Sequence, residues 1–265
     1  MKSMTQIANI ALVTGADSGM GLEFSRQLAE RGCDILMVSN RAKELQDAAQ
    51  SIRKGFPVRV EYRCVDLSAP DAAHLLSDWC EQLGLSPSIL INNAGIFYME
   101  YLSPSVLPKA DTMIALHIKA VTDLCILLGS RMKAAGKGYI LNMASVTARI
   151  PAPGIAVYSA TKAYLKSFGK SLSYELRPFG VSVTTVCPAA VDTALYQLSD
   201  KLRRTLRRLG LMQTPQHLVS RALRAMFRRR RSCNPGILNV ILPPLVGILP
   251  SRLIDRLGIK WIYGK

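Results

Sequence analysis

Short apolar segments alternate with longer segments of helical periodicity along most of this chain. The apolar segments are expected to form strands at residues 9–14, 34–39, 57–64, 88–92, 138–144 and 180–187. The segments between them are expected to form helices at residues 19–31, 42–54, 69–83, 107–135 and 156–177. Parallel strands need a crossover between them and are buried on both faces. The alternation therefore predicts an α/β fold built on a doubly wound parallel sheet.

Positive charge is concentrated in the last quarter of the chain. Residues 1–200 carry 19 Lys and Arg against 17 Asp and Glu, whereas residues 201–265 carry 15 against one. A chain of 265 residues with 49% hydrophobic residues is long enough for one domain of this class and too apolar to be disordered. We predict a single domain over 1–265, with a nearly neutral body in 1–200 and a basic, helical C-terminal extension in 201–265.

The N-terminus and the cysteines bear on location. The apolar residues 7–14 continue into a glycine-rich turn, which indicates a first strand rather than a signal peptide. We find no run of about 18 apolar residues that would span a membrane. None of the six cysteines forms a CxxC pair or lies in a His cluster, so we expect no metal site and no disulfide framework. Reduced, mostly buried thiols favour a cytoplasmic protein.

A glycine-rich turn follows the first predicted strand. It reads Thr14-Gly15-Ala16-Asp17-Ser18-Gly19-Met20-Gly21. Gly15 suits a tight turn, Gly19 lets the backbone approach a pyrophosphate, and Gly21 lets the following helix pack closely. The helix N-terminus adds positive potential for phosphates. A flexible turn would also explain three glycines, but their place between a strand and a helix favours a dinucleotide site.

The residues after the second and third strands bear on which dinucleotide binds. The second strand ends at Ser39, Asn40 and Arg41, where an NAD site usually has an acid. Arg41 can pair with a 2′-phosphate, which favours NADP(H) over NAD(H); the alternative is that Arg41 begins a solvated helix. Asp66, followed by Leu67, either accepts a hydrogen bond from adenine or caps a helix.

Tyr158 and Lys162 lie four residues apart in a predicted helix and share one face. A free tyrosine has a pKa near 10, and a neighbouring lysine cation lowers a tyrosine pKa by favouring the phenolate. Ser145, at the end of the fifth strand, can donate a hydrogen bond to a substrate oxygen. This set suits proton transfer to a carbonyl oxygen while a cofactor delivers hydride to the carbon.

Together these motifs resemble the short-chain dehydrogenase/reductase family, whose fold is Rossmann-like. The resemblance is carried by Thr14–Gly21, Asp66, Asn92–Gly95, Ser145, Tyr158–Lys162 and Pro188–Thr193. It implies that Asn93, Ala94 and Gly95 line the cofactor. It also implies that Val191 and Thr193 hold the nicotinamide carboxamide beside Pro188, and that Lys162 binds the nicotinamide ribose.

Two positions depart from the family pattern. The family usually has an asparagine in the helix after the Asn-Asn-Ala-Gly segment, where it supports a proton relay to the lysine; here that position is His117. Either His117 supports the relay with an altered pH dependence, or it is a core histidine with both nitrogens satisfied. Ala189 stands where glycine is usual, and we attach little functional weight to that change.

The basic C-terminal part combines arginines with apolar spacing. Leucines from Leu195 to Leu209 recur at helical spacing, Thr214 and Pro215 are suited to begin a second helix, and that helix is expected to end in Arg228–Arg231. Three interpretations remain open: a solvated face around a substrate lid, attachment to an anionic membrane, or capture of an acidic substrate. We expect no nucleic acid binding, since no aromatic residues interleave the arginines.

The sequence thus predicts an NADP(H)-dependent enzyme that interconverts a ketone or aldehyde and an alcohol on a small or lipid-like substrate. Tyr158 is the expected acid–base, Ser145 positions the carbonyl, and Lys162 lowers the pKa of Tyr158 and binds the nicotinamide ribose. The alternative is a non-catalytic NADP(H)-binding sensor or a membrane-peripheral scaffold. The resemblance implies a homodimer or homotetramer formed through helices 107–135 and 156–177.

Overall fold

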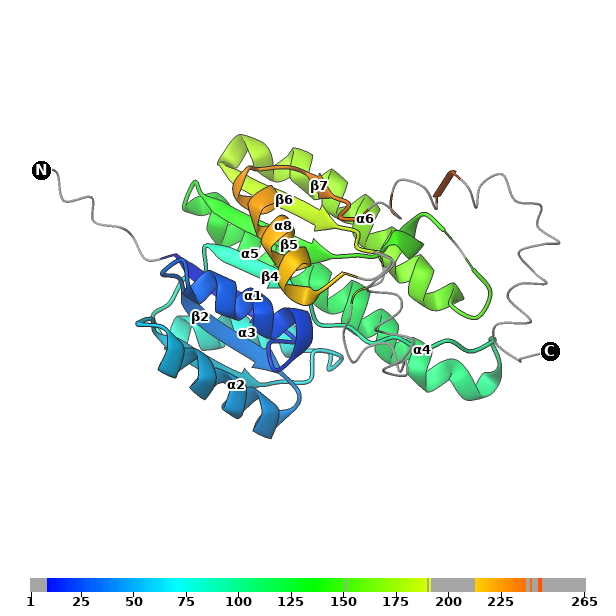
Figure 1. Ribbon diagram of the computed structural model, residues 1–265, viewed down its shortest axis with the longest axis horizontal. Helices are drawn as coiled ribbons and strands as arrows, with labels where there is room; N and C mark the ends of the chain where they lie inside the picture. The colour runs from blue at the N-terminus through cyan, green and yellow to red at the C-terminus, as the bar shows by residue number, and fades with distance from the viewer. Residues whose placement is uncertain are drawn as a thin grey trace, which may run out of the picture.

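A computed structural model describes residues 9–150, 152–189, 191, 213–236, 239 and 243–244. Its centre is one parallel sheet with the strand order β3-β2-β1-β4-β5-β6-β7 (Figure 1). The strands are β1 (Ile10–Thr14), β2 (Asp34–Ser39), β3 (Val60–Cys64), β4 (Ile89–Asn92), β5 (Gly138–Met143), β6 (Val181–Val186) and β7 (Ser232–Cys233). The predicted doubly wound parallel sheet is confirmed.

Helices cover both faces of the sheet (Figure 1). The α-helices are α1 (Gly19–Ala29), α2 (Ala42–Gly55), α3 (Ala72–Gln82), α4 (Leu107–Ile114), α5 (Ala120–Ala134), α6 (Ala156–Leu176) and α8 (Pro215–Phe227). Single turns or short segments form η1 (Pro104–Val106), η2 (Ala115–Lys119), η3 (Val146–Ala148) and η4 (Arg177–Phe179). Helices α1, α2 and α8 pack on one face, and α3, α5 and α6 pack on the other.

The alternation of side chains along each strand divides the core between these two layers. On β1, Val13 faces α1, α2 and α8, whereas Leu12 faces α3, α5 and α6. Both side chains are fully buried, as the near-continuous apolar strands predict. The chain crosses from β1 to β2 on one side and later returns to place β4 on the other side of β1. In sheets of this kind, ligands bind beyond the carboxyl ends of the strands at such a reversal.

Part of the predicted basic extension completes the core. Thr214 begins α8 as expected, because its hydroxyl accepts a hydrogen bond of 3.3 Å from the backbone N–H of His217. Leu218 and Leu223 of α8 are fully buried, and the carbonyl of Gln216 accepts a hydrogen bond from Gln27 of α1. The helix ends at Phe227 rather than in Arg228–Arg231, and β7 follows as a strand that the sequence did not predict. The leucine-spaced segment 195–209 lies outside the described residues.

The long predicted helix 107–135 is interrupted. Residues Ala115–Lys119 form a π-helical turn between α4 and α5, and His117 lies within it. Such turns insert one residue into a helix and occur often at functional sites. Counted as one helix, Pro104–Ala134 is long enough to cross a membrane, and an 18-residue window within it has a mean hydropathy of 1.6, which was not expected from the sequence. Its α5 part packs in the core through Leu124 and Leu128.

Two further element boundaries differ from the sequence prediction. Strand β3 begins at Val60 rather than at residue 57, and α3 begins at Ala72 rather than at residue 69, because a turn at Asp66–Ser68 and Pro70 precede it. All six cysteines are free, and four are buried: Cys33, Cys80, Cys125 and Cys187.

Candidate active site

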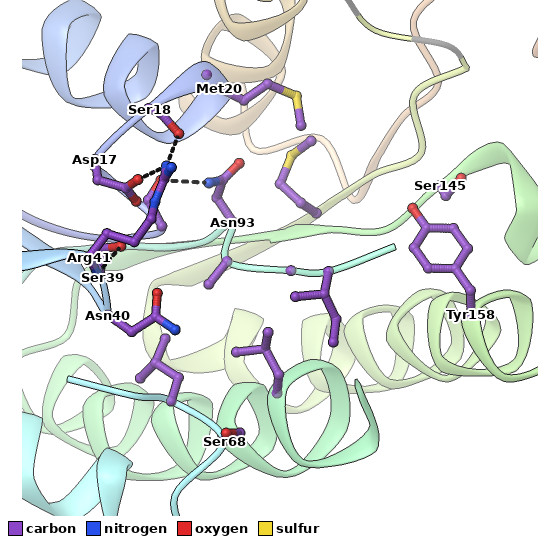
Figure 2. Close-up of a pocket in the computed structure, with 18 of the residues that line it drawn as sticks. Asp17, Ser18, Met20, Ser39, Asn40, Arg41, Ser68, Asn93, Ser145 and Tyr158 are labelled. Carbon is purple, nitrogen blue, oxygen red and sulfur yellow. Dashed lines mark hydrogen bonds and ion pairs between the residues drawn. The ribbon is translucent and has the colours of Figure 1, made fainter. Parts of the chain in front are cut away.

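One cleft of about 510 Å³ lies where the carboxyl ends of β1, β2, β4 and β5 meet. Figure 2 shows its two ends, with Asp17, Ser18 and Arg41 at one and Ser145 and Tyr158 at the other. Most of the predicted cofactor residues line it: Gly15, Asp17, Ser18, Gly19, Met20, Asn40, Arg41, Asp66, Leu67, Asn93, Ala94, Gly95, Tyr158, Lys162, Pro188 and Val191. The fold thus brings together segments that are far apart in the sequence.

The glycine-rich turn has the backbone that its sequence predicts. Gly15 and Gly19 have φ angles of +63° and +54°, which favour glycine. A Cβ on Gly21 would lie 1.8 Å from the carbonyl oxygen of Gly15, so only glycine allows α1 to pack this closely on the turn. Because Gly19 is the first residue of α1, the helix N-terminus faces the cleft with its unpaired N–H groups.

Thr14 and Asn93 join the turn to the end of β4. The Thr14 hydroxyl accepts hydrogen bonds of 3.0 Å from the backbone N–H groups of Asn93 and Ala94. The Asn93 amide nitrogen donates to the carbonyl of Thr14 at 3.0 Å. Thr14 therefore supports the cleft from behind, whereas Asn93 also lines it. Among the residues that the structure describes, the buried Asn93 Oδ1 has no hydrogen-bond partner.

Arg41 lies over the glycine-rich turn. Its guanidinium forms an ion pair with Asp17 and donates a 2.6 Å hydrogen bond to the hydroxyl of Ser18 (Figure 2). The Asp17 side chain is only 5% exposed, whereas that of Arg41 is 49% exposed. The ion pair orients the guanidinium over the glycine-rich turn, and an arginine has further N–H donors for an anion. Arg41 occupies the N-cap position of α2, but its side chain turns back to the cleft.

Asp66 also lies at the cleft, but it does not cap a helix. Its Oδ1 accepts hydrogen bonds from the backbone N–H and the hydroxyl of Ser68, at 2.9 and 2.7 Å, and Asp71 is the N-cap of α3. The helix-cap interpretation of Asp66 is therefore wrong. The turn also brings Ser68 into the lining of the cleft, a residue that no sequence motif marks.

Tyr158, Lys162 and Ser145 meet at the other end of the cleft. Each is about 5% exposed, and the Tyr158 hydroxyl points toward Ser145 in Figure 2. The Lys162 Nζ lies 5.4 Å from the centroid of the Tyr158 ring and donates a 3.1 Å hydrogen bond to the Met143 carbonyl. Burial lowers the pKa of Lys162 to about 8, so the ammonium form still predominates at neutral pH. The Ser145 hydroxyl accepts a hydrogen bond from Thr147 N–H at 3.2 Å, which leaves its proton for a ligand.

His117 does not line the cleft, but it lies directly behind it. The ring is fully buried, and its Nε2 accepts a 3.1 Å hydrogen bond from the backbone N–H of Ile96. Its Nδ1 lies 3.0 Å from the Thr161 hydroxyl, which itself donates to the Tyr158 carbonyl at 2.8 Å. Nδ1 is therefore the protonated nitrogen. Burial, and then the Lys162 charge, lower the pKa of His117 well below its usual range. These contacts favour the satisfied core histidine over a proton relay.

Several lining residues were not predicted from the sequence. Ile96, Thr112 and Leu116 come from the segment after β4, and Met143 and Ala144 come from the end of β5. These residues shape the wall of the cleft and carry no catalytic group, so no sequence motif marks them. Met143 differs in that its carbonyl also accepts the Lys162 hydrogen bond. Thr193 lies outside the described residues, and Ala189, which replaces the usual glycine, lines the cleft without closing it.

Residues 9–203 match the model of the short chain dehydrogenase family. The chain belongs to this family. It is thus an oxidoreductase of the class that interconverts alcohols and carbonyl compounds, as the sequence predicted.

Among curated proteins, the chain is 32% identical over 192 residues to very-long-chain 3-oxoacyl-CoA reductase-A of Danio rerio, which covers 71% of this chain and 60% of that protein. It is 28% identical to 17-beta-hydroxysteroid dehydrogenase type 3 of Mus musculus, over 92% and 77% of the two chains. Among solved structures, a short-chain dehydrogenase from Sphingobium yanoikuyae in complex with NADPH has 27% identity and a TM-score of 0.76, over 92% and 97% of the two chains.

The contacts of His117 lead to a prediction on stability. His117→Phe keeps a ring of similar shape but leaves the Ile96 N–H without its acceptor, which should cost about 1–3 kcal/mol of unfolding free energy. In the wild-type protein, His117 stays neutral while the unfolded chain takes up a proton below its ordinary pKa of 6.5. Wild-type stability should therefore fall as the pH drops below 6.5, and this component should be absent from the variant.

Urea unfolding at several pH values from neutral to acidic measures both effects. His74→Phe, on the exposed side of α3, is the control for loss of an imidazole. Equal pH dependence in the wild-type and His117→Phe proteins would show that His117 is not held neutral in the fold.

Proposed function

We propose that this protein is an NADP(H)-dependent oxidoreductase that interconverts a ketone or aldehyde and an alcohol on a substrate with an apolar body. The observation that carries the proposal is the convergence of Ser145, Tyr158 and Lys162, all buried, at one end of a cleft whose other end holds a glycine-rich turn. A scaffold that only bound a dinucleotide could use Lys162 on the ribose, but it would not need Ser145 and Tyr158 beside that lysine.

The residues of the cleft fit a dinucleotide. The turn at Gly15–Gly21 offers backbone N–H groups and a helix N-terminus to a pyrophosphate. The unpartnered Asn93 Oδ1 is a buried acceptor for a donor on the ligand. No acid follows β2, and Arg41 stands beside Ser18 with exposed surface, which supports a 2′-phosphate and hence NADP(H). The NADPH-bound relative from Sphingobium yanoikuyae supports the same cofactor.

When bound, the nicotinamide supplies or accepts the hydride at the substrate carbon. In the reduction direction, Tyr158 donates its phenolic proton to the carbonyl oxygen as negative charge develops there. The Ser145 hydroxyl donates a hydrogen bond to the same oxygen and orients the carbonyl. The Lys162 ammonium stabilises the phenolate that forms on Tyr158, and the Met143 carbonyl holds Lys162 in place. In the oxidation direction, the phenolate accepts the proton of the alcohol.

The lining of the cleft supports an apolar substrate. Ile96, Leu116 and Met143 add apolar surface to the cleft that holds Tyr158. The relatives named as a 3-oxoacyl-CoA reductase and a hydroxysteroid dehydrogenase agree with a carbonyl on a large apolar body. Association into dimers or tetramers and a cytoplasmic or membrane-peripheral location remain predictions.

The role of Arg41 gives a test of the cofactor. Arg41→Gln removes the charge that would pair with a 2′-phosphate, so KM for NADPH should rise roughly tenfold to a hundredfold, while KM for NADH should change little. Steady-state reduction of a panel of ketones and aldehydes with each cofactor measures this. Arg59→Gln, which removes an exposed arginine paired with Glu61, is the matched control. An unchanged preference for NADPH in Arg41→Gln would reject the assignment of the 2′-phosphate to Arg41.

A further inference from the structure

A second cleft, of about 470 Å³, lies along the edge of the sheet formed by β6 and β7. It includes Val181–Val183 at the start of β6, whereas Pro188 and Ala189 of the active site follow the end of this strand, and the two clefts share no lining residue. The other walls come from α6 and η4, through Ser173 and Arg177, from Arg229–Arg231 between α8 and β7, and from Ser232 of β7. Figure 1 shows these elements together at one edge of the sheet. We call this site the basic cleft.

Four arginines line the basic cleft: Arg177, Arg229, Arg230 and Arg231. Within the described part of the chain, none of them forms an ion pair with a carboxylate; Glu175, close in sequence on α6, is exposed and also unpaired. Cations gathered in a concave surface repel one another and concentrate positive potential there. This arrangement favours an anion that bridges them.

Aromatic rings hold two of these arginines without neutralising them. The guanidinium of Arg231 lies 4.5 Å from the centroid of the Tyr174 ring, and that of Arg229 lies 5.5 Å from the centroid of the Tyr139 ring. Arg229 also donates a 3.3 Å hydrogen bond to the Gly180 carbonyl. Ring contacts restrict the positions of the guanidinium groups but leave their full positive charge for a ligand.

The backbone of Arg229 indicates that its side chain has a role. Its N–H donates to the Met226 carbonyl at 2.8 Å, and the N–H of Arg230 donates to Ala225 at 3.0 Å, which is the usual way to end a helix with a left-handed residue. Glycine normally occupies that position. Arg229 has φ +53° and is the one described non-glycine residue with a positive φ. A strained arginine at a cleft suggests a functional constraint on its side chain.

Ser182 adds a polar group to the wall of the basic cleft. It is only 8% exposed, and its hydroxyl makes no hydrogen bond within the described structure. Ser182 lines a cleft rich in arginine, where its hydroxyl gives a further hydrogen-bond donor for an anionic oxygen.

We propose that the basic cleft binds a multiply charged phosphate group, on either a soluble phosphate compound or a phospholipid headgroup. Guanidinium groups donate paired hydrogen bonds to phosphate oxygens, and several charges are needed to offset four arginines. The site is separate from the dinucleotide cleft, so the ligand would be additional to the cofactor and substrate.

The test compares two double variants that lose charge from the same part of the chain. Arg229→Gly/Arg231→Gln removes two arginines from the basic cleft and relieves the strained backbone, so the fold should be retained. Arg221→Gln/Arg224→Gln removes two exposed arginines from α8 outside the cleft. Calorimetric titration of the full chain with inorganic tripolyphosphate, with and without saturating NADP⁺, measures binding of a soluble phosphate. Flotation with phosphatidylcholine vesicles, with and without phosphatidic acid, measures binding of a headgroup.

For at least one probe, Kd for the cleft variant should rise roughly tenfold or more, while the control variant stays close to the wild-type protein. An effect on tripolyphosphate identifies a soluble ligand, and an effect on vesicles alone identifies a headgroup. Equal weakening in both variants would mean diffuse charge attraction and would overturn the proposal. The proposal would also be overturned if the wild-type protein bound neither probe, or if NADP⁺ abolished the binding.

Discussion

Replacing Tyr158 by phenylalanine should lower kcat/KM for carbonyl reduction by about a thousandfold, because general acid catalysis contributes about 10²–10⁴-fold. The variant keeps the ring, which packs edge-on against Phe97 at 4.9 Å and against His117 at 5.9 Å between ring centroids. The fold and the dinucleotide site should therefore remain, and Kd for NADPH should stay close to the wild-type value. The loss should appear in kcat, since the proton is needed only as the transition state forms.

Three measurements separate this outcome from a structural effect. Thermal unfolding checks the fold, fluorescence titration with NADPH checks the cofactor site, and steady-state kinetics check turnover. Tyr164→Phe is the matched control: Tyr164 lies on the same helix, α6, but its hydroxyl bonds to Thr122 at 2.8 Å and does not line the cleft. Wild-type turnover by Tyr158→Phe would reject Tyr158 as the acid–base. Tight NADPH binding by the wild-type protein without turnover on any carbonyl would favour a sensor or scaffold instead.

The architecture could be predicted because β1, β2, β4 and β5 are mostly apolar, buried segments that are each followed by a helical segment. The strand at Asp34–Ser39 agrees residue by residue, since a charged residue begins it and a polar turn ends it. Strand β7 could not be predicted. It has two residues, Ser232 and Cys233, and pairs only with Thr185 and Val186 of β6, so its existence depends on the sheet edge rather than on local propensity.

The C-terminal part shows a second reason why sequence patterns fall short. The arginines around α8 suggest a solvated extension, but the other face of α8 is buried against α1 and the sheet. A high arginine content describes only the exposed face of such a helix and says nothing about its buried face. The apolar positions of α8, Leu218, Val219 and Leu223, follow helical spacing and could have indicated the buried face.

At the candidate site, motifs located the residues but not their mutual contacts. The spacing of the glycines identified Gly15, Gly19 and Gly21, because the need for glycine at each position comes from the backbone of the turn itself. The ion pair between Arg41 and Asp17 joins positions 24 residues apart, and no local rule relates them. Similarly, the sequence left two roles open for His117. His117 lies in the π-helical turn, and its contacts with Ile96 and Thr161 join it to segments that are distant in the sequence.

The remaining prediction concerns Lys162, where activity and stability should change in opposite directions. Lys162→Met replaces a buried ammonium with an apolar chain of similar length. Loss of the charge beside Tyr158 should reduce kcat/KM by roughly a hundredfold or more. The same change should raise the free energy of unfolding at pH 7, because burial disfavours the charged form of Lys162 and lowers its pKa to about 8.

The pH dependence follows from the two pKa values of Lys162. Below pH 8 the folded and unfolded chains both hold the proton, so the wild-type protein bears the full penalty, roughly 3 kcal/mol for a pKa of about 8 against 10.5. Between pH 8 and 10.5 the unfolded chain binds more protons, so wild-type stability rises relative to the variant. The unpaired Met143 carbonyl offsets part of the gain, which leaves about 1–2 kcal/mol at pH 7.

Urea unfolding of both proteins at pH 7 and near pH 10 measures this difference. The contributions of groups that titrate in both proteins cancel in the comparison. Lys166→Met, one turn further along α6 and exposed, should change neither stability nor activity by much. A lysine kept only for packing would give a variant with normal turnover. A variant that lost both activity and stability at pH 7 would mean that the Lys162 charge supports the fold itself. The predicted combination, lower turnover with higher stability, is expected when a buried charge is retained for its effect on the neighbouring tyrosine and the bound cofactor rather than for the fold.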